Sequence, residues 1–183
     1  MAVSTDVIEN PISGERVVFR QTSSDSNGEL VQFDLYFEPN RPIPIAHIHT
    51  KQEERFQVVS GSVRYRLAGI KSDLAPGDAA ILPHGIPHTL WNCGADQAHL
   101  VVEVRPAMNM EAGLETMFGL ARDGKLNKSG APNLLQGALL AREYDMFLAS
   151  PPPSVQRIGT AILSPIAKLL GYKARYAQYS GDD

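Results

Sequence analysis

Short runs of alternating apolar and polar residues fill the chain from about Arg16 to Arg105, and Gly, Pro or Asn breaks them apart. In the run 30–37 every second residue is apolar, namely Val31, Phe33, Leu35 and Phe37. Such alternation places the apolar side chains on one face of a strand. Short strands at this spacing predict an antiparallel all-β sandwich or barrel.

The second half of the chain has a different periodicity. After Pro106 the apolar residues follow helical spacing, which predicts one helix over Met110–Arg122 and another over Asn133–Leu148. A chain of 183 residues is long enough for one domain with an appendage. We therefore divide it into a β-domain over residues 1–106 and a C-terminal helical extension over residues 107–183, packed on the β-domain.

A third helix is expected near the C-terminus. The prolines at 151–153 must interrupt any helix, Ser154 can cap the next one, and Gly171 can end it. Its apolar residues share one face: Val155, Ile158, Ile162, Ile166, Leu169 and Leu170. With Arg157 and Lys168 at its flanks, this face has the pattern of a helix that lies on a membrane surface. We expect it to pack on the β-domain instead, because a half-apolar helix is typical of a docked element.

Composition limits the class of protein and its partners. An apolar fraction of 43% and a net charge of -3 describe a globular chain without long disordered tracts. The sequence lacks the clustered Lys and Arg residues typical of nucleic-acid-binding proteins. No apolar run approaches the roughly 20 residues of a membrane span. The single cysteine, Cys93, cannot form an internal disulfide and is predicted to be a small buried thiol. The N-terminal residues lack a signal-peptide pattern, so we expect a cytoplasmic protein.

Two histidines two residues apart, His47 and His49, are the first sign of a metal site, because on a strand both point to the same face. Two neighbouring carboxylates, Glu53 and Glu54, compete to join them. Glu54 shares a strand face with Phe56, which should face the interior, whereas Glu53 should face outward. We therefore favour Glu54.

A second stretch supplies a third histidine. Pro83 and Gly85 predict a turn just before His88, and this turn can direct His88 toward the first pair. Three neutral imidazoles and one carboxylate suit a single divalent transition metal ion such as Fe, Mn, Ni, Cu or Zn. Such a ligand set leaves coordination positions open for water or a substrate.

These two stretches resemble the two sequence motifs of the cupin superfamily. The first, G(x)5HxH(x)3–4E(x)6G, is matched by His47, His49, Glu54 and Gly61. The second, G(x)5PxG(x)2H(x)3N, is matched by Gly77, Pro83, Gly85, His88 and Asn92. The opening glycine of the first motif falls at Arg41, a departure that affects loop shape more than metal binding.

The resemblance covers roughly Val17 to Pro106 and implies a double-stranded β-helix, the jelly-roll-like cupin barrel, with the four ligands inside it. It implies a metal-dependent enzyme that acts on a small organic substrate, and the reaction it favours is that of a dioxygenase-like oxidoreductase. Alternatives within the family are a metal-dependent isomerase or decarboxylase and a non-catalytic cupin that binds a sugar or another small ligand. Cupin barrels commonly pair through their sheets, so the resemblance implies a homodimer; alternatively, the C-terminal helices cover that face of the barrel within one chain. The helical tail is similar to that of uncharacterised bacterial single-domain cupins.

Other polar residues near these motifs are expected to have structural roles. His84 and His99 are predicted to lie away from the site, and Glu103 is predicted to face outward. Asn92 should support the turn or strand that follows His88. Two further residues neighbour the predicted site strands and are candidates for a pocket: Gln52 and Tyr65.

Overall fold

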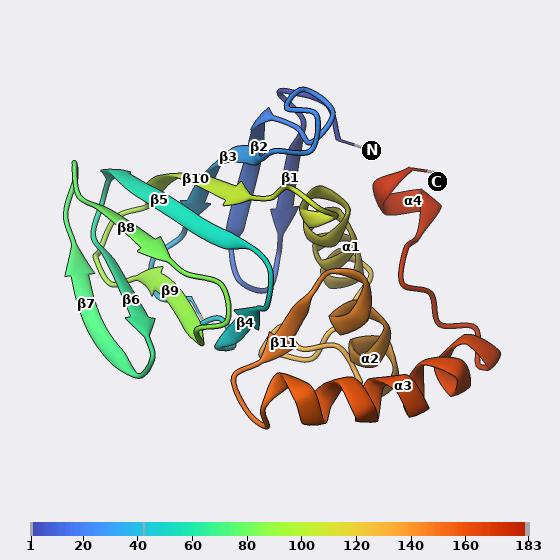
Figure 1. Ribbon diagram of the computed structural model, residues 1–183. Helices are drawn as coiled ribbons and strands as arrows, with labels where there is room; N and C mark the ends of the chain where they lie inside the picture. Colours follow the sequence, from blue (N-terminus) through green and yellow to red (C-terminus); the bar gives the residue numbers. More distant parts are fainter. Residues whose placement is uncertain (1, 42, 182–183) are drawn as a thin grey trace.

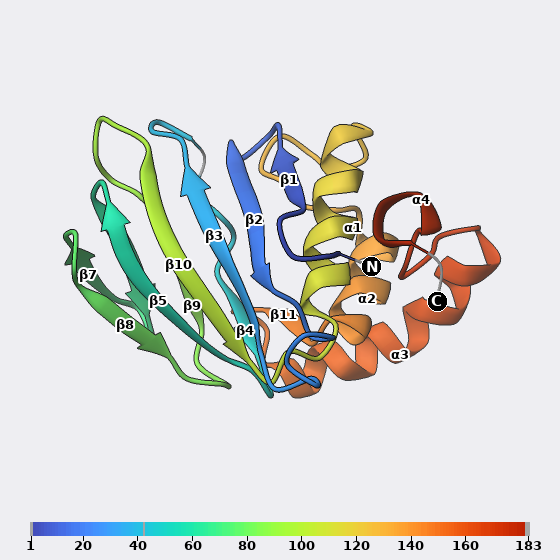
Figure 2. The same cartoon turned by 90° about the horizontal axis from the view of Figure 1, so that it is seen from above.

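The computed structural model describes residues 2–41 and 43–181. The chain forms two antiparallel β-sheets, and the helices gather at one end of them, beside β1 and β11 (Figures 1 and 2). The first sheet has the strand order β1 (Val7–Asn10), β2 (Glu15–Gln21), β3 (Val31–Phe37), β10 (Ala98–Arg105), β5 (Glu53–Ser60) and β8 (Ala79–Leu82). The second has the order β11 (Met146–Leu148), β4 (His47–His49), β9 (His88–Asn92), β6 (Val63–Leu67) and β7 (Ile70–Leu74).

The main core lies between the two sheets and follows the predicted alternation. The four apolar residues expected on the inner face of β3 are all buried. Leu35 and Phe33 of β3 are the Cα partners of Leu100 and Val102 of β10, so apolar side chains of neighbouring strands lie side by side. From the second sheet, Tyr65 packs edge-on against Phe56 with ring centroids 5.9 Å apart.

Within the described part of the chain, four helices follow β10: α1 (Met110–Arg122), α2 (Leu134–Glu143), α3 (Pro153–Leu169) and α4 (Ala177–Ser180). The first has the predicted bounds. It packs against β1 and α4, and α2 packs against α3. A second, smaller core joins α1 and α2 through Leu120, Ala121, Leu126, Leu140 and Tyr144.

The second predicted helix is shorter than expected. We expected it to continue to Leu148, but α2 ends at Glu143, and Asp145 adopts a left-handed backbone with φ +50°. Residues 146–148 form β11 instead, which pairs antiparallel with β4. The backbone hydrogen bonds offered by the edge of β4 outweigh the helical periodicity of this segment, because local propensity is a weak determinant.

The third helix ends as predicted but begins differently. Its N-cap is Pro152, Pro153 is its first residue, and Ser154 is not the cap. At its C-terminus Gly171 has φ +84°, and the amide N–H of Tyr172 donates to the carbonyl of Ala167 at 3.0 Å. This is a Schellman motif, in which glycine takes the left-handed position.

The apolar face of α3 does not pack on the β-domain, so that prediction was wrong. Its six apolar residues are between 45% and 87% exposed. The buried residues of α3 are Thr160, Ser164 and Ala167, which lie on the opposite side. This side of α3 faces α2, which packs against it.

Cys93 is exposed, contrary to the expectation of a buried thiol. It lies just after β9, at the start of the turn that leads to β10, and its amide N–H donates to the carbonyl of Ser62 at 3.0 Å. Its backbone is therefore held while its side chain faces solvent.

No helix among residues 2–41 and 43–181 is both long and apolar enough to cross a membrane.

The motif glycine Gly61 is required by a close backbone approach. Its φ is +81°, and a Cβ atom added there would lie 2.6 Å from the Cα of Ala98. We predict that Gly61→Ala lowers the free energy of unfolding by more than about 3 kcal/mol, because both strain and a backbone clash result. Urea unfolding measures this loss.

Gly69→Ala is the matched control. Gly69 has φ +87° with nothing within 4 Å of the added atom, so it carries the backbone strain without the clash. We expect it to cost about 1–2 kcal/mol. Equal losses in the two variants would contradict the role of the Ala98 contact.

Candidate metal centre

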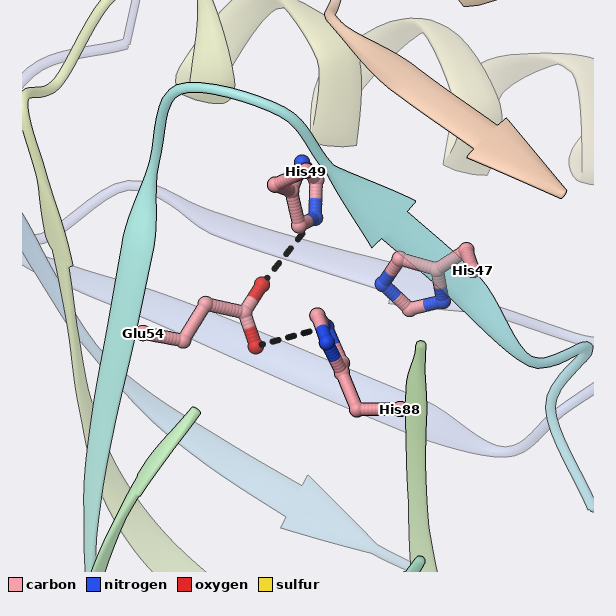
Figure 3. Close-up of side chains that lie close together, drawn as sticks. All are labelled: His47, His49, Glu54 and His88. Atoms are coloured by element: carbon pink, nitrogen blue, oxygen red, sulfur yellow. Dashed lines mark ion pairs between the residues drawn. The ribbon is translucent and has the colours of Figure 1, made fainter. Parts of the chain in front are cut away.

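Three short strands bring the four predicted ligands together (Figure 3). His47 and His49 lie on β4, Glu54 lies near the start of β5, and His88 is the first residue of β9. One ligand atom from each residue can be chosen such that all four atoms lie within 4.8 Å of one another. The sequence-predicted set therefore forms one cluster.

Strand geometry explains the convergence. His47 and His88 are direct Cα partners across β4 and β9, so their rings come to lie 4.6 Å apart between centroids. His49 is two residues further along β4 and therefore points to the same side as His47. The turn that contains Gly85 is fastened to this strand, because the amide N–H of Gly85 donates to the carbonyl of His49 at 2.7 Å.

The Glu54 carboxylate lies between two of the imidazoles. Its Oε1 is 3.2 Å from Nε2 of His49, and its Oε2 is 3.7 Å from Nε2 of His88. The Glu54 side chain is 12% exposed, and that of the competing Glu53 is 30% exposed. Glu53 instead accepts a hydrogen bond from Nε of Arg55 at 2.7 Å. The alternation of β5 thus directs Glu54, and not Glu53, toward the histidines.

Backbone carbonyls orient two of the rings. Nδ1 of His47 lies 3.0 Å from the carbonyl oxygen of Ile45, and Nδ1 of His88 lies 2.9 Å from that of Ile86. Because a carbonyl only accepts, Nδ1 carries the proton in both rings and the Nε2 lone pair faces the cluster. Nε2 of His88 is buried and has no hydrogen-bond partner among the described residues.

This donor set fits a divalent metal ion. Neutral imidazole nitrogens and a carboxylate are ligands of Fe, Mn, Ni, Cu and Zn, and a buried nitrogen lone pair without a donor is the kind of atom that an ion would satisfy.

Burial and mutual charge keep His47, His88 and Glu54 in the deprotonated forms. Burial lowers the pKa of His47 to about 3, with further lowering from the other two histidines. Burial also lowers the pKa of His88, against the opposing effect of Glu54. Burial alone would raise the pKa of Glu54, but the hydrogen bond to His49 and the three imidazoles bring it to about 2. Metal ligation needs these deprotonated forms.

The remaining histidines lie outside the cluster. His84 is exposed on the turn before β9. His99 stacks on Tyr36, with ring centroids 4.4 Å apart, and its Nε2 lies 2.5 Å from Oδ1 of Asp34. Arg20 donates to the same carboxylate at 2.6 Å. Burial acts to raise the pKa of Asp34, but the hydrogen bonds from Arg20 and His99 bring it below its ordinary value.

The two pocket candidates are occupied by contacts within the chain. Nε2 of Gln52 donates to the carbonyls of Pro106 at 3.0 Å and Ala107 at 2.9 Å, so Gln52 ties the segment before β5 to the end of β10. Tyr65 lies against the main core. Both therefore serve packing in this structure.

Asn92 and Glu103 take the structural positions predicted for them. Nδ2 of Asn92 donates to the carbonyls of Phe37 and Asp96, and its Oδ1 accepts from the amide of Gly94 at 2.8 Å, so Asn92 shapes the turn after β9. Glu103 accepts a hydrogen bond from Arg105 at 2.6 Å and lies away from the cluster.

A hydrogen-bonded connection to the C-terminal segment was missed at the level of sequence. Met146 and Leu148 of β11 are the Cα partners of His49 and His47. Beside them, the Thr50 hydroxyl donates to Oδ1 of Asp145 at 2.6 Å and accepts from Nη2 of Arg157 at 2.7 Å. The strand that carries two candidate ligands is thus held by residues far along the chain.

The sequence offered one signal for this connection, the short apolar triplet Met146–Leu148 after Asp145, but helical periodicity across the same residues concealed it.

Comparison with known proteins identifies the class. Residues 33–104 match the sequence model of the cupin domain family. This stretch contains all four clustered residues and both motifs, so residues 33–104 form a cupin domain.

A protein from Arthrobotrys oligospora that is named an oxidoreductase is 29% identical in a match of 154 residues, which covers 76% of this chain. The chain spans 60% of the length of that curated relative.

Solved structures are also similar to part of the chain. An RmlC-like cupin from Shewanella frigidimarina has a TM-score of 0.49 and 20% identity, over 58% of this chain and 88% of that chain. A sugar phosphate isomerase of the cupin superfamily from Silicibacter pomeroyi has a TM-score of 0.48 and 18% identity, over 56% of this chain and 71% of that chain. KdgF from Halomonas sp. has a TM-score of 0.47 and 22% identity, over 55% of this chain and 86% of that chain.

The lowered pKa values predict acid sensitivity of the metal-free protein. The pKa of His47 is 6.5 in the unfolded chain and about 3 in the folded protein. The pKa of Glu54 is 4.5 in the unfolded chain and about 2 in the folded protein. Unfolding therefore binds protons below pH 6.5, and the free energy of unfolding must decline as the pH falls through this range.

Urea unfolding at a series of pH values measures this decline. His47→Gln should make the free energy of unfolding depend less on pH between pH 6.5 and about 3, the pKa values of His47 in the unfolded and folded states. The exposed His84 provides the control, and His84→Gln should leave the profile unchanged. A wild-type profile that is flat below pH 6.5 would contradict the assignment.

Proposed function

We propose that this protein is a metal-dependent enzyme that acts on a small organic substrate, with dioxygenase-like oxidation as the reaction we favour. In this proposal one divalent transition metal ion is bound by His47, His49, Glu54 and His88. The observation that carries it is the cluster itself, in which three imidazoles and one carboxylate converge in the interior of a cupin domain.

The chain's own residues prepare the site for this role. The carbonyls of Ile45 and Ile86 hold two rings with their Nε2 atoms toward the cluster. Glu54 contributes the negative charge that a divalent cation requires. Phe56 follows Glu54 on the same face of β5 and packs on Tyr65, so the wall beyond the carboxylate is apolar. An ion bound here would act as a Lewis acid and, if redox-active, would support oxygen chemistry.

The oxidoreductase name of the Arthrobotrys oligospora relative supports an oxidative reaction over the alternatives. A closed barrel, a domain boundary at residue 106, a homodimer and a cytoplasmic location also belong to the proposal. Analytical ultracentrifugation tests the homodimer, and cell fractionation tests the location.

Removal of single ligands should reduce metal content. We predict that His49→Ala and His88→Ala each lose more than about 90% of the bound metal. Loss of a residue that only hydrogen-bonds to a ligand typically lowers metal affinity by about 10–100-fold, and loss of a ligand itself should lower it more. Glu54→Gln should lose less, since an amide oxygen still coordinates but lacks the charge. Elemental analysis by plasma mass spectrometry gives the metal content of protein purified without a metal-binding tag.

Glu53→Gln is the matched control, since it changes the neighbouring carboxylate that lies on the outer face and pairs with Arg55. It should keep the full metal content. Full metal content in both histidine variants would overturn the assignment of the site.

Turnover tests the reaction itself. The metal-loaded protein is supplied with enol and phenol substrates while oxygen consumption is recorded, and His88→Ala serves as the inactive reference. Oxygen uptake that depends on both substrate and metal supports the dioxygenase-like reaction. Three other results would each replace this reaction with an alternative. Release of carbon dioxide without oxygen uptake would indicate a decarboxylase, and isomerisation of a sugar phosphate would indicate an isomerase. Tight binding of a ligand without turnover would indicate a non-catalytic binding protein.

A further inference from the structure

The outer face of α3 is an extended apolar ridge. Val155, Ile158, Ile162, Ile166, Leu169 and Leu170 lie on it, and their exposures range from 45% to 87%. In Figure 1 α3 runs along the lower edge of the molecule, with α2 above it. The inner side of α3 is already packed, so its outer face faces solvent. Apolar patches of this kind on a protein surface mark sites of interaction.

Basic residues accompany the ridge. Residues 146–181 contain four Lys or Arg and no Asp or Glu, although the whole chain has a net charge of -3. Two of the four, Arg157 and Arg175, contact Thr50 and Glu143 within the chain. The ammonium groups of Lys168 and Lys173 have no hydrogen-bond or ion-pair partner among the described residues.

These two lysines line an open hollow of about 580 Å³ next to the C-terminal end of the ridge. Glu143 also lines it, but its carboxylate is paired with Arg175 at 2.8 Å. The hollow therefore presents positive charge beside Leu169 and Leu170. An apolar surface next to a cationic hollow is complementary to an anionic headgroup with acyl chains behind it.

We propose that α3 docks this protein on an anionic membrane surface, with its apolar ridge in the acyl-chain boundary and Lys168 and Lys173 among the headgroups. The helix lies on the surface and does not span it. The proposal is independent of the metal centre.

Two features favour a lipid surface over a second copy of the chain. Pro165 lies within α3 and has no N–H to donate to the carbonyl of Ala161, and both residues are exposed. Water and headgroups can satisfy that carbonyl, whereas a tight helix-to-helix contact would bury it. In addition, two copies paired through α3 would bring the lysines of both copies, Lys168 and Lys173, toward one another, and like charges repel.

Vesicle co-sedimentation tests the proposal with two lipid compositions: phosphatidylcholine alone, and phosphatidylcholine with phosphatidylglycerol in equal amounts. We expect the protein to pellet with the anionic vesicles, and the pelleted fraction to fall at high salt. The double variant Ile158→Ser, Ile162→Ser should lower the partition coefficient by about tenfold or more, since two large side chains leave the lipid. Lys168→Gln and Lys173→Gln should each lower it about fivefold.

Ile70→Ser is the matched control. Ile70 is 72% exposed on β7, at the opposite end of the molecule from α3, so its loss should leave vesicle binding unchanged. All substituted side chains are exposed, and circular dichroism melting should give the wild-type transition for each variant.

Three outcomes would overturn the proposal. One is protein that stays in the supernatant with anionic vesicles. Another is vesicle binding that is equal for both lipid compositions and unaffected by the lysine substitutions. The third is a dimer in analytical ultracentrifugation that Ile158→Ser, Ile162→Ser converts to a monomer without any vesicle binding, which would assign the ridge to a second copy.

Discussion

The geometry of the candidate metal centre depends on how the three-residue strand β4 is held between two neighbours. On one side His47 pairs with His88 of β9, which joins the two halves of the ligand set directly. On the other side β11 pairs with all three residues of β4. A strand this short makes few hydrogen bonds of its own, so its position is determined by the elements beside it. The direction of two candidate ligands is therefore a property of the whole second sheet.

The β-region could be predicted in detail because burial repeats with a period of two. The inner face of β3 and the choice of Glu54 over Glu53 both followed from alternation, and the structure has them as expected. The cluster of four side chains was predictable because residue types and spacing in two short motifs determine it. The Thr50, Asp145 and Arg157 contacts were not predictable, since they join positions about a hundred residues apart that carry no shared pattern.

The helical half was predicted less well, and the reason is physical. Apolar periodicity reports that a helix has an apolar face, but it does not report what that face contacts. For α1 the bounds were correct, whereas in α3 the packed side consists of Thr160, Ser164 and Ala167 and the apolar side faces outward. For residues 146–148 a free strand edge was available, and pairing with β4 replaced helix. In each case a tertiary contact decided what local sequence left open.

The pairing of β4 with β11 also has a consequence for the order of events during synthesis. His49 leaves the ribosome roughly a hundred residues before Met146, its partner, which at typical elongation rates is an interval of about 5–20 s. Throughout that interval the outer edge of β4 offers unpaired backbone groups to any other strand. The motif with the two histidines is thus translated early, but the strand that carries it acquires its second neighbour only about a hundred residues later.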